Sequence, residues 1–352
     1  MRTKIIGMKS LGLRNIGVRS VGCIGVPSSG GIAHKSLVDE LLAKMKKEQP
    51  DLFRSLLLWY NPALQGITNK QLYDDNIEQG YSVLKDLSGN GYDARVIGMS
   101  GLEGDGHVNE DGQLVFDSLD DYTITDNIMR SIPMSLIFSG DVTSDRIGYI
   151  FSLANHVSMY YQLSNLRWRI AAFGQGAATI NYNTTDNITD VVLISDGHAE
   201  INGTPRALTN GTMLNNIAQM RLMTSGANYA HGELHAFTLF SKSITEDEKQ
   251  WLYNNFINIQ IEQKQVTLNI YSADGAPYQS IKVNKGSQYK LTNMVVSPSE
   301  VANRYYYDID DPSTEIDTDF FFVGDKDVNI YFTTAPRKDY ILEKMNDEQP
   351  HY

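Results

Sequence analysis

Residues 86–94 read DLSGNGYDA, and residues 114–122 read LVFDSLDDY. Both stretches concentrate aspartate, glycine, serine or asparagine beside short apolar runs, which is typical of turns between strands. Glycine at positions 89 and 91 permits the positive φ angles of a tight irregular turn. The side chain of Asp86 can hydrogen-bond the local backbone there. These two turns therefore predict a β-rich fold around them.

Strand and turn signals continue on both sides, from about residue 52 to residue 258. Residues 157–163 and 166–170 alternate apolar and polar side chains across Ser164-Asn165, which predicts a hairpin. Val191–Ser195 and His198–Ile201 flank Asp196-Gly197, a strong two-residue hairpin turn. Thr245, with Glu248 three residues later, predicts the capped start of a closing helix over Thr245–Phe256.

Four segments resemble the laminin-G-like jelly rolls of the concanavalin A-like lectin and glucanase superfamily. Leu58–Tyr60 resembles the opening strand, residues 86–94 and 114–122 resemble the two turn motifs, and residues 232–256 resemble the last strand and terminal helix. Ser118 stands where that family usually has glycine. The resemblance implies two stacked antiparallel sheets and a carbohydrate- or protein-binding surface, but it does not imply catalysis.

The expected fold class is all-β: a concanavalin A-like jelly-roll sandwich and a small C-terminal β-sandwich, with an extended arm and one short helix. Residues 37–49 carry an apolar stripe at helical spacing, which either packs on the jelly roll or forms an oligomer neck. The expected organisation is a basic Gly-repeat arm over 1–35, a helix or neck over 36–50, a jelly roll over 51–260, an Ig-like sandwich over 264–335 and a tail over 336–352.

The N-terminal arm repeats with a period of five residues and differs in charge from the rest of the chain. Residues 1–35 contain six basic side chains and no acidic one, although the whole chain carries a net charge of −12. A short repeat cannot bury its apolar positions alone, so we expect the arm to anchor in a neighbouring molecule. The alternative is a soluble leader. The anchoring residues are expected to be Ile6, Gly7, Lys9, Leu11, Gly12, Arg14, Ile16, Gly17 and Arg19.

Two other features limit the class of protein. The single cysteine, Cys23, excludes an internal disulfide framework. No apolar run approaches the roughly 20 residues of a membrane-spanning helix, and glycines and bases interrupt any signal-peptide core. We therefore expect no membrane insertion and no conventional secretion.

The arm, followed by β-rich modules, also resembles the architecture of bacteriophage fibre or decoration proteins. This resemblance implies a non-enzymatic structural protein on the surface of a virion, with other virion proteins as partners of residues 1–35. It implies a homo-oligomer, with a trimer favoured, and a host-surface glycan as ligand of the jelly roll. Nucleic acid is a less favoured partner. The alternative is a bacterial cell-surface carbohydrate-binding protein or a glycoside hydrolase accessory module.

No catalytic residues are predicted. Related glucanases use a Glu-x-Asp-x-x-Glu strand with paired carboxylates, and residues 315–319 (EIDTD) approach this pattern. They lie outside the expected jelly roll and end in aspartate. His231 and His235 share a strand face, but a zinc site needs further ligands.

Calcium is the one metal that the sequence suggests, and no cofactor is required. Oxygen-rich turns suit this hard cation. Asp86, Ser88, Asn90 and Asp93 are the expected ligands, and the aspartates of residues 117–121 are a further set. The alternative is that these side chains only stabilise turns.

Glycan contacts are expected from outward aromatic rings beside hydrogen-bonding side chains. Tyr160, Tyr182 and Tyr229 fit this description, and the alternative for each is an ordinary surface position. Trp168 has the apolar parity of its strand and is expected in the core. In the run Tyr305–Tyr307 at least one ring is expected to face solvent or a partner.

Overall fold

The structure is a computed structural model. It describes residues 29–333 except 103, 118, 126–133, 144–146, 154–156, 163–166, 173–177, 183–185, 195–197, 208–218, 226, 260, 262, 273, 290, 292–303, 309–311, 318–320 and 325. The arm residues named above, Cys23 and the tail over 336–352 lie outside the described residues. Residues 164–165 and 196–197, where hairpin turns were predicted, also lie outside the described residues.

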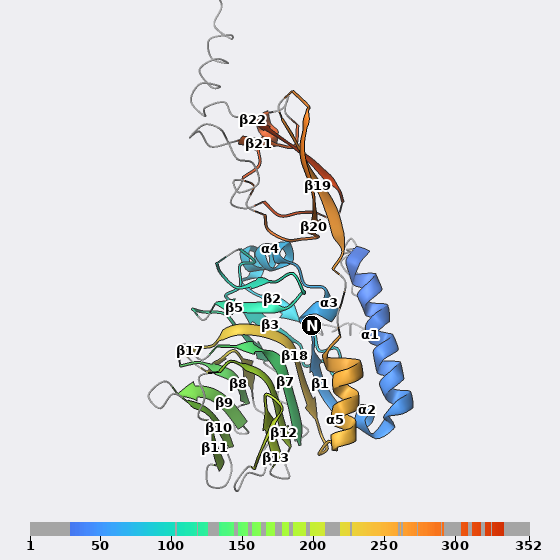
Figure 1. Cartoon of the computed structure of the whole chain (residues 1–352), viewed down its shortest axis with the longest axis vertical. Coiled ribbons are helices and arrows are strands. Elements are labelled where there is room, and N and C mark those ends of the chain that lie inside the picture. Colours follow the sequence, from blue (N-terminus) through green and yellow to red (C-terminus); the bar gives the residue numbers. More distant parts are fainter. Residues whose placement is uncertain are drawn as a thin grey trace, which may run out of the picture.

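Two eight-stranded sheets form the body of the molecule (Figure 1). The first sheet has the order β14 (Thr204–Ala207), β13 (His198–Ile201), β12 (Ile188–Ile194), β7 (Ser135–Val142), β18 (His231–Phe240), β5 (Leu114–Asp117) and β4 (His107–Val108), with β1 (Leu56–Tyr60) also paired to β18. The second sheet has the order β11 (Ala178–Tyr182), β10 (Arg167–Ala172), β9 (Val157–Gln162), β8 (Tyr149–Leu153), β15 (Met220–Leu222), β6 (Tyr122–Thr125), β3 (Ala94–Ile97) and β2 (Ser82–Leu84). A short pair, β16 (Thr224–Ser225) and β17 (Asn228–Tyr229), lies beside β15.

The main hydrophobic core lies between the two sheets. Phe116 and Phe138 contribute from the first sheet, and Phe151 and Trp168 from the second. All four side chains are almost fully buried, and the strands within both sheets pair antiparallel. The expected all-β jelly-roll sandwich is therefore confirmed, and Trp168 is a core residue as expected.

Both predicted hairpins form, and the first has the register expected for a turn at residues 164–165. In the second, Ile194 lies opposite His198, so three residues separate the strands in place of the predicted two. β9 pairs with β10 and β12 pairs with β13. The next hairpin, between β13 and β14, turns through Asn202 and Gly203, whose φ angles are 48° and 69°. Two consecutive positive φ angles define the turn whose twist matches paired strands, which explains the Asn-Gly pair at this point.

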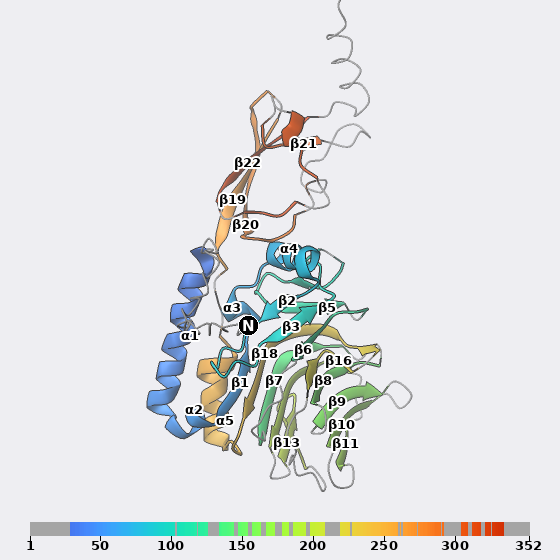
Figure 2. The same ribbon diagram turned by 180° about the vertical axis from the view of Figure 1, so that it is seen from behind.

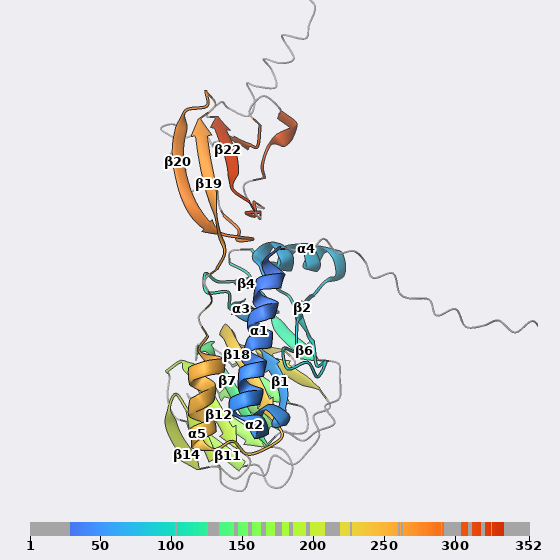
Figure 3. The same cartoon turned by 90° about the vertical axis from the view of Figure 1, so that its right-hand side faces the viewer.

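A helical layer covers the outer face of the first sheet (Figures 1 and 3). It consists of α1 (Ser29–Glu48), α2 (Pro50–Ser55), α5 (Glu246–Leu252) and the π-helical turn η2 (Tyr253–Ile257). The apolar stripe of α1 packs against the sheet, and Met45 is fully buried there. Packing on the jelly roll is thus the alternative that the structure favours over a free neck. α1 also begins at Ser29, inside the residues 1–35 that were expected to form the arm.

α1 and α5 contact each other as well as the sheet. Lys44 Nζ donates to Asn255 Oδ1 at 2.8 Å, and Trp251 Nε1 donates to Glu48 Oε2 at 3.0 Å. Under them, Trp59 of β1 stacks on Phe256 with ring centroids 3.7 Å apart. The N-terminal and C-terminal helical elements of the jelly roll therefore form one layer.

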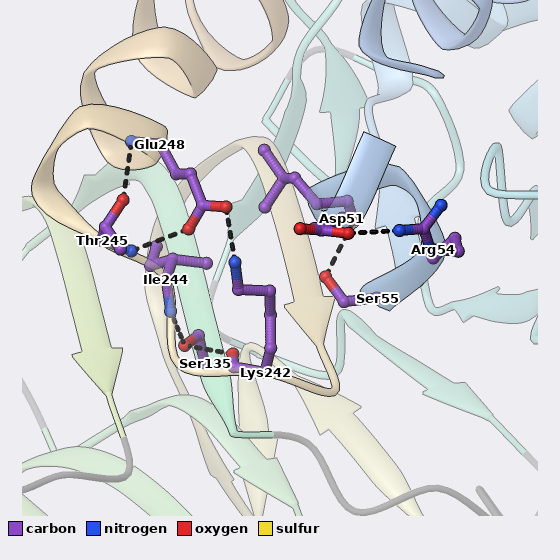
Figure 4. A network of polar contacts seen from close by, with 9 residues as sticks. Asp51, Arg54, Ser55, Ser135, Lys242, Ile244, Thr245 and Glu248 are labelled. Carbon is purple, nitrogen blue, oxygen red and sulfur yellow. Dashed lines mark hydrogen bonds and ion pairs between the residues drawn. The ribbon is translucent and has the colours of Figure 1, made fainter. Parts of the chain in front are cut away.

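A polar network fixes α5 at its start (Figure 4). Thr245 Oγ1 accepts from the backbone N–H of Glu248, and Glu248 Oε2 accepts from that of Thr245, which is the predicted capping box. Glu248 also accepts from Lys242 at 2.5 Å. Ser135 Oγ donates to the Lys242 carbonyl and accepts from the Ile244 N–H, so the helix entry is tied to β7.

Two short helices after β1 were not predicted: α3 (Pro62–Gln65) and α4 (Asn69–Gln79). Thr68 caps α4 by accepting from the Gln71 N–H, and Gly80 ends it with a φ of 79°. The helix is polar, and Leu72 is its only buried apolar residue, so it lacks the apolar periodicity by which helices are predicted.

The C-terminal module differs from the expected Ig-like sandwich. Its described strands form one sheet in the order β20 (Pro277–Asn284), β19 (Gln265–Ser272), β22 (Val328–Thr333) and β21 (Arg304–Tyr306), and η4 (Pro312–Thr314) is a 3₁₀ turn. β19 and β22 pair parallel, an arrangement that strand alternation alone does not specify. Tyr305 and Tyr306 are buried, whereas Tyr307 is 49% exposed. This agrees with the expectation that at least one of the three rings faces solvent or a partner.

The module extends from the α4 end of the jelly roll (Figure 2). The backbone N–H of Lys70 donates to the carbonyl of Gly286 at 2.9 Å, and Tyr73 contacts Phe322 with ring centroids 5.0 Å apart. α4 therefore supports the junction between the two modules. Among the described residues, no helix combines the length and the apolar character needed to cross a bilayer.

Candidate ligand-binding surfaces

No described helix covers the outer face of strands β8 to β11 of the second sheet, although α4 contacts β2 at the other edge of that sheet. Figures 1 and 2 show α1 and α5 against the first sheet, and no described helix lies over strands β8 to β11. Outward side chains of these strands are only partly accessible, because Tyr149, Tyr160 and Arg169 are half-buried and Ser158 is 2% exposed. The first sheet buries part of its outer face under α1 and α5. The sequence placed one glycan candidate, Tyr160, on this face.

Tyr160 lies on the opposite side of β9 from its buried neighbours Met159 and Tyr161. Its ring stacks on Tyr149 of β8, with centroids 4.8 Å apart and an interplanar angle of 26°. Burial, and then the neighbouring Tyr160, raises the pKa of Tyr149. Both rings are half-buried, so this pair forms a fixed aromatic platform.

Arginines flank the aromatic platform. Arg169 of β10 pairs directly with Tyr160 in the sheet register, and Arg221 of β15 pairs with Ser152 of β8. Directly paired residues of an antiparallel sheet present their side chains on the same face. The uncovered face therefore combines tyrosine rings with guanidinium and hydroxyl groups.

The other two tyrosine candidates occupy different positions. Tyr229 of β17 packs beside Tyr122 of β6, with ring centroids 6.1 Å apart. Gly148, just before Tyr149, lies close to the backbone of Tyr229. A Cβ atom on Gly148 would be 2.7 Å from the Tyr229 carbonyl oxygen. Tyr229 is thus near the Tyr149 end of the platform. Tyr182 pairs with the buried Trp168 in register, and its side chain is outside the described part.

A polar groove of about 880 Å³ lies on the first sheet beside α5, and the sequence did not reveal it. Its lining includes Asp190 of β12, His198 and Glu200 of β13, Asn202 of the following turn, Glu246 and Lys249 of α5, and Tyr253 of η2. A second hollow of about 770 Å³ shares Ser139, His235 and Asn258 with it. These residues are dispersed along the chain, so no local motif joins them.

Ionisable groups are coupled in this groove. Burial, countered by a hydrogen bond from Tyr253, gives Asp190 a pKa of about 6. Burial lowers the pKa of Lys249, but its hydrogen bonds to Glu200 at 2.6 Å and Glu246 at 2.9 Å outweigh burial and raise it. The groove offers donors and acceptors, but its charged side chains already pair with one another.

The predicted calcium ligands at residues 86–93 form a closed hydrogen-bond network. Asp86 Oδ1 accepts from the backbone N–H groups of Trp59 and Ser88 and from Ser88 Oγ, and Asp86 Oδ2 accepts from the Tyr92 N–H. Asp93 accepts from the Asp86 N–H at 2.9 Å and from Lys85 Nζ at 2.6 Å. Asn90 Nδ2 donates to the carbonyls of residues 56 and 57. This geometry favours the turn-stabilising alternative, and calcium binding there stays a prediction.

Four carboxylates meet at the second aspartate-rich turn. One oxygen from each of Asp105, Asp117, Asp120 and Asp121 lies within 4.8 Å of the others. Asp121 is fully buried. Burial is the largest cause of a raised pKa of Asp121, which is about 8. The hydrogen bond from the Asp117 backbone N–H lowers this pKa, and the negative charges of Asp117 and Asp105 raise it further. The sequence suggested Asp117, Asp120 and Asp121 but missed Asp105, which precedes β4.

The remaining candidates do not assemble into a site within the described residues. His235 contacts Glu233 at 3.2 Å on its own strand, and no cluster of metal-ligating side chains includes His231. Glu315 pairs with Arg304 at 3.1 Å in the C-terminal module, and Asp319 is not described. A catalytic carboxylate pair at residues 315–319 therefore has no support from geometry.

Comparisons with known proteins give distant structural similarity alone. No family model matches the chain, and no curated protein matches it. Trypanosoma rangeli sialidase in complex with sialic acid is 12% identical, with a TM-score of 0.40, over 63% of this chain and 39% of that chain. The binding domain of botulinum neurotoxin DC in complex with rat synaptotagmin II is 14% identical, with a TM-score of 0.40, over 62% of this chain and 58% of that chain. The match thus spans less than two thirds of either protein and does not assign a function.

Proposed function

We propose that this chain is a non-enzymatic glycan-binding protein on the surface of a phage-like particle. The outer face of the second sheet is its binding surface, and the basic N-terminal arm is its anchor. The observation that carries the binding part is the stacked Tyr149–Tyr160 pair on a sheet face without a helical cover. The anchoring part is supported by the charge and repeat of residues 1–35.

The platform has the chemistry that sugar binding requires. A tyrosine ring offers apolar area to the C–H face of a sugar and keeps a hydroxyl group for hydrogen bonding. Stacking restrains both rings, so little side-chain freedom is lost when a ligand binds. Arg169, paired with Tyr160 in register, supplies donors that suit hydroxyl and carboxylate groups. Tyr229 and Tyr122 extend the aromatic surface toward the rim.

A glycan array, followed by titration of the strongest binder, tests this proposal. Tyr149→Ala and Tyr160→Ala should each weaken binding about tenfold, since about 1.4 kcal/mol of contact energy corresponds to that factor. Tyr278→Ala is the matched control, because Tyr278 is 48% exposed in the C-terminal module. Unchanged affinity in both platform variants would contradict the assignment of the platform.

The polar groove beside α5 provides the competing location. His198→Ala removes a groove side chain without touching the second sheet. Loss of binding in that variant, with normal binding in the tyrosine variants, would move the site to the first sheet. The absence of any glycan ligand, with and without calcium, would remove the binding part of the proposal.

The anchoring part is tested by truncation. Deleting residues 1–28 leaves α1 complete, so the body should stay folded and soluble but no longer join particles. Deleting residues 336–352 is the control, and that chain should still be incorporated. Light scattering of the free chain reports its oligomeric state, which we propose to be a trimer. Full incorporation of the chain without residues 1–28 into particles would contradict the anchoring role of the arm. That result, or the presence of the full chain in a cell envelope, favours the alternative of a cell-surface binding protein or accessory module.

A further inference from the structure

We propose that the polar groove beside α5 receives the basic N-terminal arm of a second copy of this chain. The groove is formed by the first sheet, α5 and η2. Its occupant is the part of the arm that precedes α1, residues 1–28. The inference rests on the anchoring role proposed above for the arm, and it names the molecule in which the arm anchors. It is independent of glycan binding, which is assigned to the second sheet.

The charge of the groove is opposite to that of the arm. The carboxylates in the lining of the groove are Asp141, Asp190, Glu200 and Glu246, and its one ammonium group is that of Lys249. The adjoining hollow adds Asp111. Residues 1–28 contain no acidic side chain, and their basic side chains are Arg2, Lys4, Lys9, Arg14 and Arg19. Complementary charge of this kind steers two surfaces together and fixes how they meet.

Two of the groove carboxylates are not neutralised by the chain itself. Lys249 is held between Glu200 and Glu246, and no ion pair of the described residues involves Asp141 or Asp190. Oδ1 of Asp141 is buried and has no hydrogen-bond partner in the described part of the chain. Asp190 is largely ionised at neutral pH, because its pKa is about 6. A lysine or arginine of the arm would therefore stabilise both charges.

These two carboxylates lie together on the outer face of the first sheet. Asp190 of β12 pairs in register with Ser139 of β7, and Asp141 follows Ser139 by two residues. Residues two apart on a strand point to the same face. A cation that enters the groove beside α5 consequently meets both carboxylates.

The adjoining hollow provides an apolar wall for the same segment. Ile257, Ile259 and Ile261 line it beside Ala63 of α3. Each of the first three repeat units of the arm, such as Ile6–Ser10, carries two apolar side chains, one glycine and one base. A groove with an acidic section and an apolar section suits that composition, because it satisfies both kinds of side chain.

The arm is long enough to reach a neighbouring molecule. α1 begins at Ser29 and packs on the outer face of the first sheet, which also carries the groove. Fully extended, residues 1–28 span roughly 90 Å, about twice the diameter of a domain of this size. If each copy gives one arm and receives one, the head-to-tail exchange can close into a ring such as a trimer.

Titration of a synthetic peptide of residues 1–28 into the chain that lacks these residues tests the inference. Calorimetry should give one site per chain. Raising the salt concentration from about 50 to about 500 mM should weaken binding about tenfold or more, because salt screens exposed charges. Light scattering should show an oligomer for the full chain and a monomer for the shortened chain, and excess peptide should dissociate the oligomer.

Glu246→Lys locates the contact, and Asp247→Lys is its matched control. Both residues are exposed in the first turn of α5, but Glu246 lines the groove and Asp247 does not. Glu246→Lys should weaken peptide binding about tenfold. Asp247→Lys should change it by about twofold or less, because its charge is screened from the groove. Circular dichroism confirms the fold of the shortened chain and of each variant.

A peptide with the residues of 1–28 in scrambled order separates the repeat from its charge. It should bind about tenfold more weakly than the natural order, because it keeps the bases but loses their spacing from the apolar side chains. Equal binding of the two peptides would show unspecific charge attraction and overturn the inference.

Three further results would overturn the inference. They are an absence of peptide binding at about 1 mM, equal binding by the folded Glu246→Lys and Asp247→Lys variants, and a full chain that is monomeric. A shortened chain that stays out of particles yet does not bind the peptide would show that the arm anchors in another protein, so this inference would fail while the anchoring role stands. Peptide binding together with full incorporation of the shortened chain would support the contact and contradict anchoring in the particle.

Discussion

The two aspartate-rich turns have similar sequences but opposite surroundings. Asp86 and Asp121 are both buried. The oxygens of Asp86 accept from three backbone N–H groups and one hydroxyl group. Asp121 accepts from one N–H group and otherwise faces three carboxylates. A buried aspartate therefore accepts hydrogen bonds as a carboxylate in the first turn, whereas in the second turn burial and the neighbouring carboxylates raise its pKa to about 8.

The largest expected effect is at Asp86. Asp86→Ala removes the acceptor for the N–H groups of Trp59 and Tyr92 and leaves buried donors without partners. Hydrogen bonds to a charged group contribute about 1.5–3 kcal/mol each, so the loss should be about 4 kcal/mol in the free energy of unfolding. Urea denaturation measures it, with Asp111→Ala as an exposed control. A loss below about 1 kcal/mol would contradict the role of Asp86 as the anchor of this turn.

The next effect is a pH dependence at Asp121. The pKa of Asp121 is about 8 in the folded chain, whereas an aspartate in an unfolded chain has a pKa of about 4. Between these values the folded chain holds a proton that the unfolded chain releases, so stability falls as pH rises from about 4 to 8. Without calcium, the melting temperature should therefore drop across this window.

Asp121→Asn should flatten that pH dependence, because the neutral amide replaces a group that must ionise next to Asp105, Asp117 and Asp120. Scanning calorimetry in EDTA at pH 5 and pH 8.5 compares the two chains. An equally steep decline in the variant would place the pH dependence elsewhere.

Glycine substitutions sharpen the comparison at the level of the backbone. Gly89 has a φ of 83° with nothing within 4 Å of an added Cβ, so Gly89→Ala should cost about 1 kcal/mol from the backbone angle alone. At Gly98 the Cβ would also meet the Asp120 carbonyl at 2.7 Å. Gly98→Ala should therefore cost about 1–2 kcal/mol more than Gly89→Ala. Equal costs in urea denaturation would show that the second turn is loosely packed.

The smallest effect is expected at Lys85, whose ammonium group contacts Asp93 at 2.6 Å. The Lys85 side chain is 57% exposed and the Asp93 side chain 38%, and such solvent-accessible pairs contribute about 0–1 kcal/mol. Lys85→Ala should change the unfolding free energy by less than about 0.5 kcal/mol. A larger loss would mean that the ion pair, as well as the buried amides, supports the first turn.

Local signals explain what the sequence predicted correctly. The turn at residues 86–94 and the capping box of α5 depend on residues within a few positions of one another. The apolar stripe of α1 likewise predicted its buried face. In each case the physical cause is a backbone angle, a cap or a periodicity that adjacent residues specify.

Features that depend on distant segments were not predictable in the same way. The parallel pairing of β19 with β22 joins strands that are far apart in the sequence. Asp105 reaches the other aspartates because the β4–β5 pair brings its segment back to the turn. The groove beside α5 combines residues of β7, β12 and β13 with residues of α5 and η2. None of these has a local pattern, since the fold itself brings the residues together.

The pairing of β1 with β18 has a mechanical consequence. Leu56, where the chain enters the sandwich, lies opposite Phe240, where it leaves, and α1 and α5 lie side by side above this point (Figures 1 and 3). Separating the N-terminal segment from the C-terminal module would therefore have to break the hydrogen bonds of Lys44 to η2 and of Glu48 to α5 as well as the pairing of β1 with β18. The two ends of the jelly roll are thus joined twice, once through the helical layer and once through the sheet.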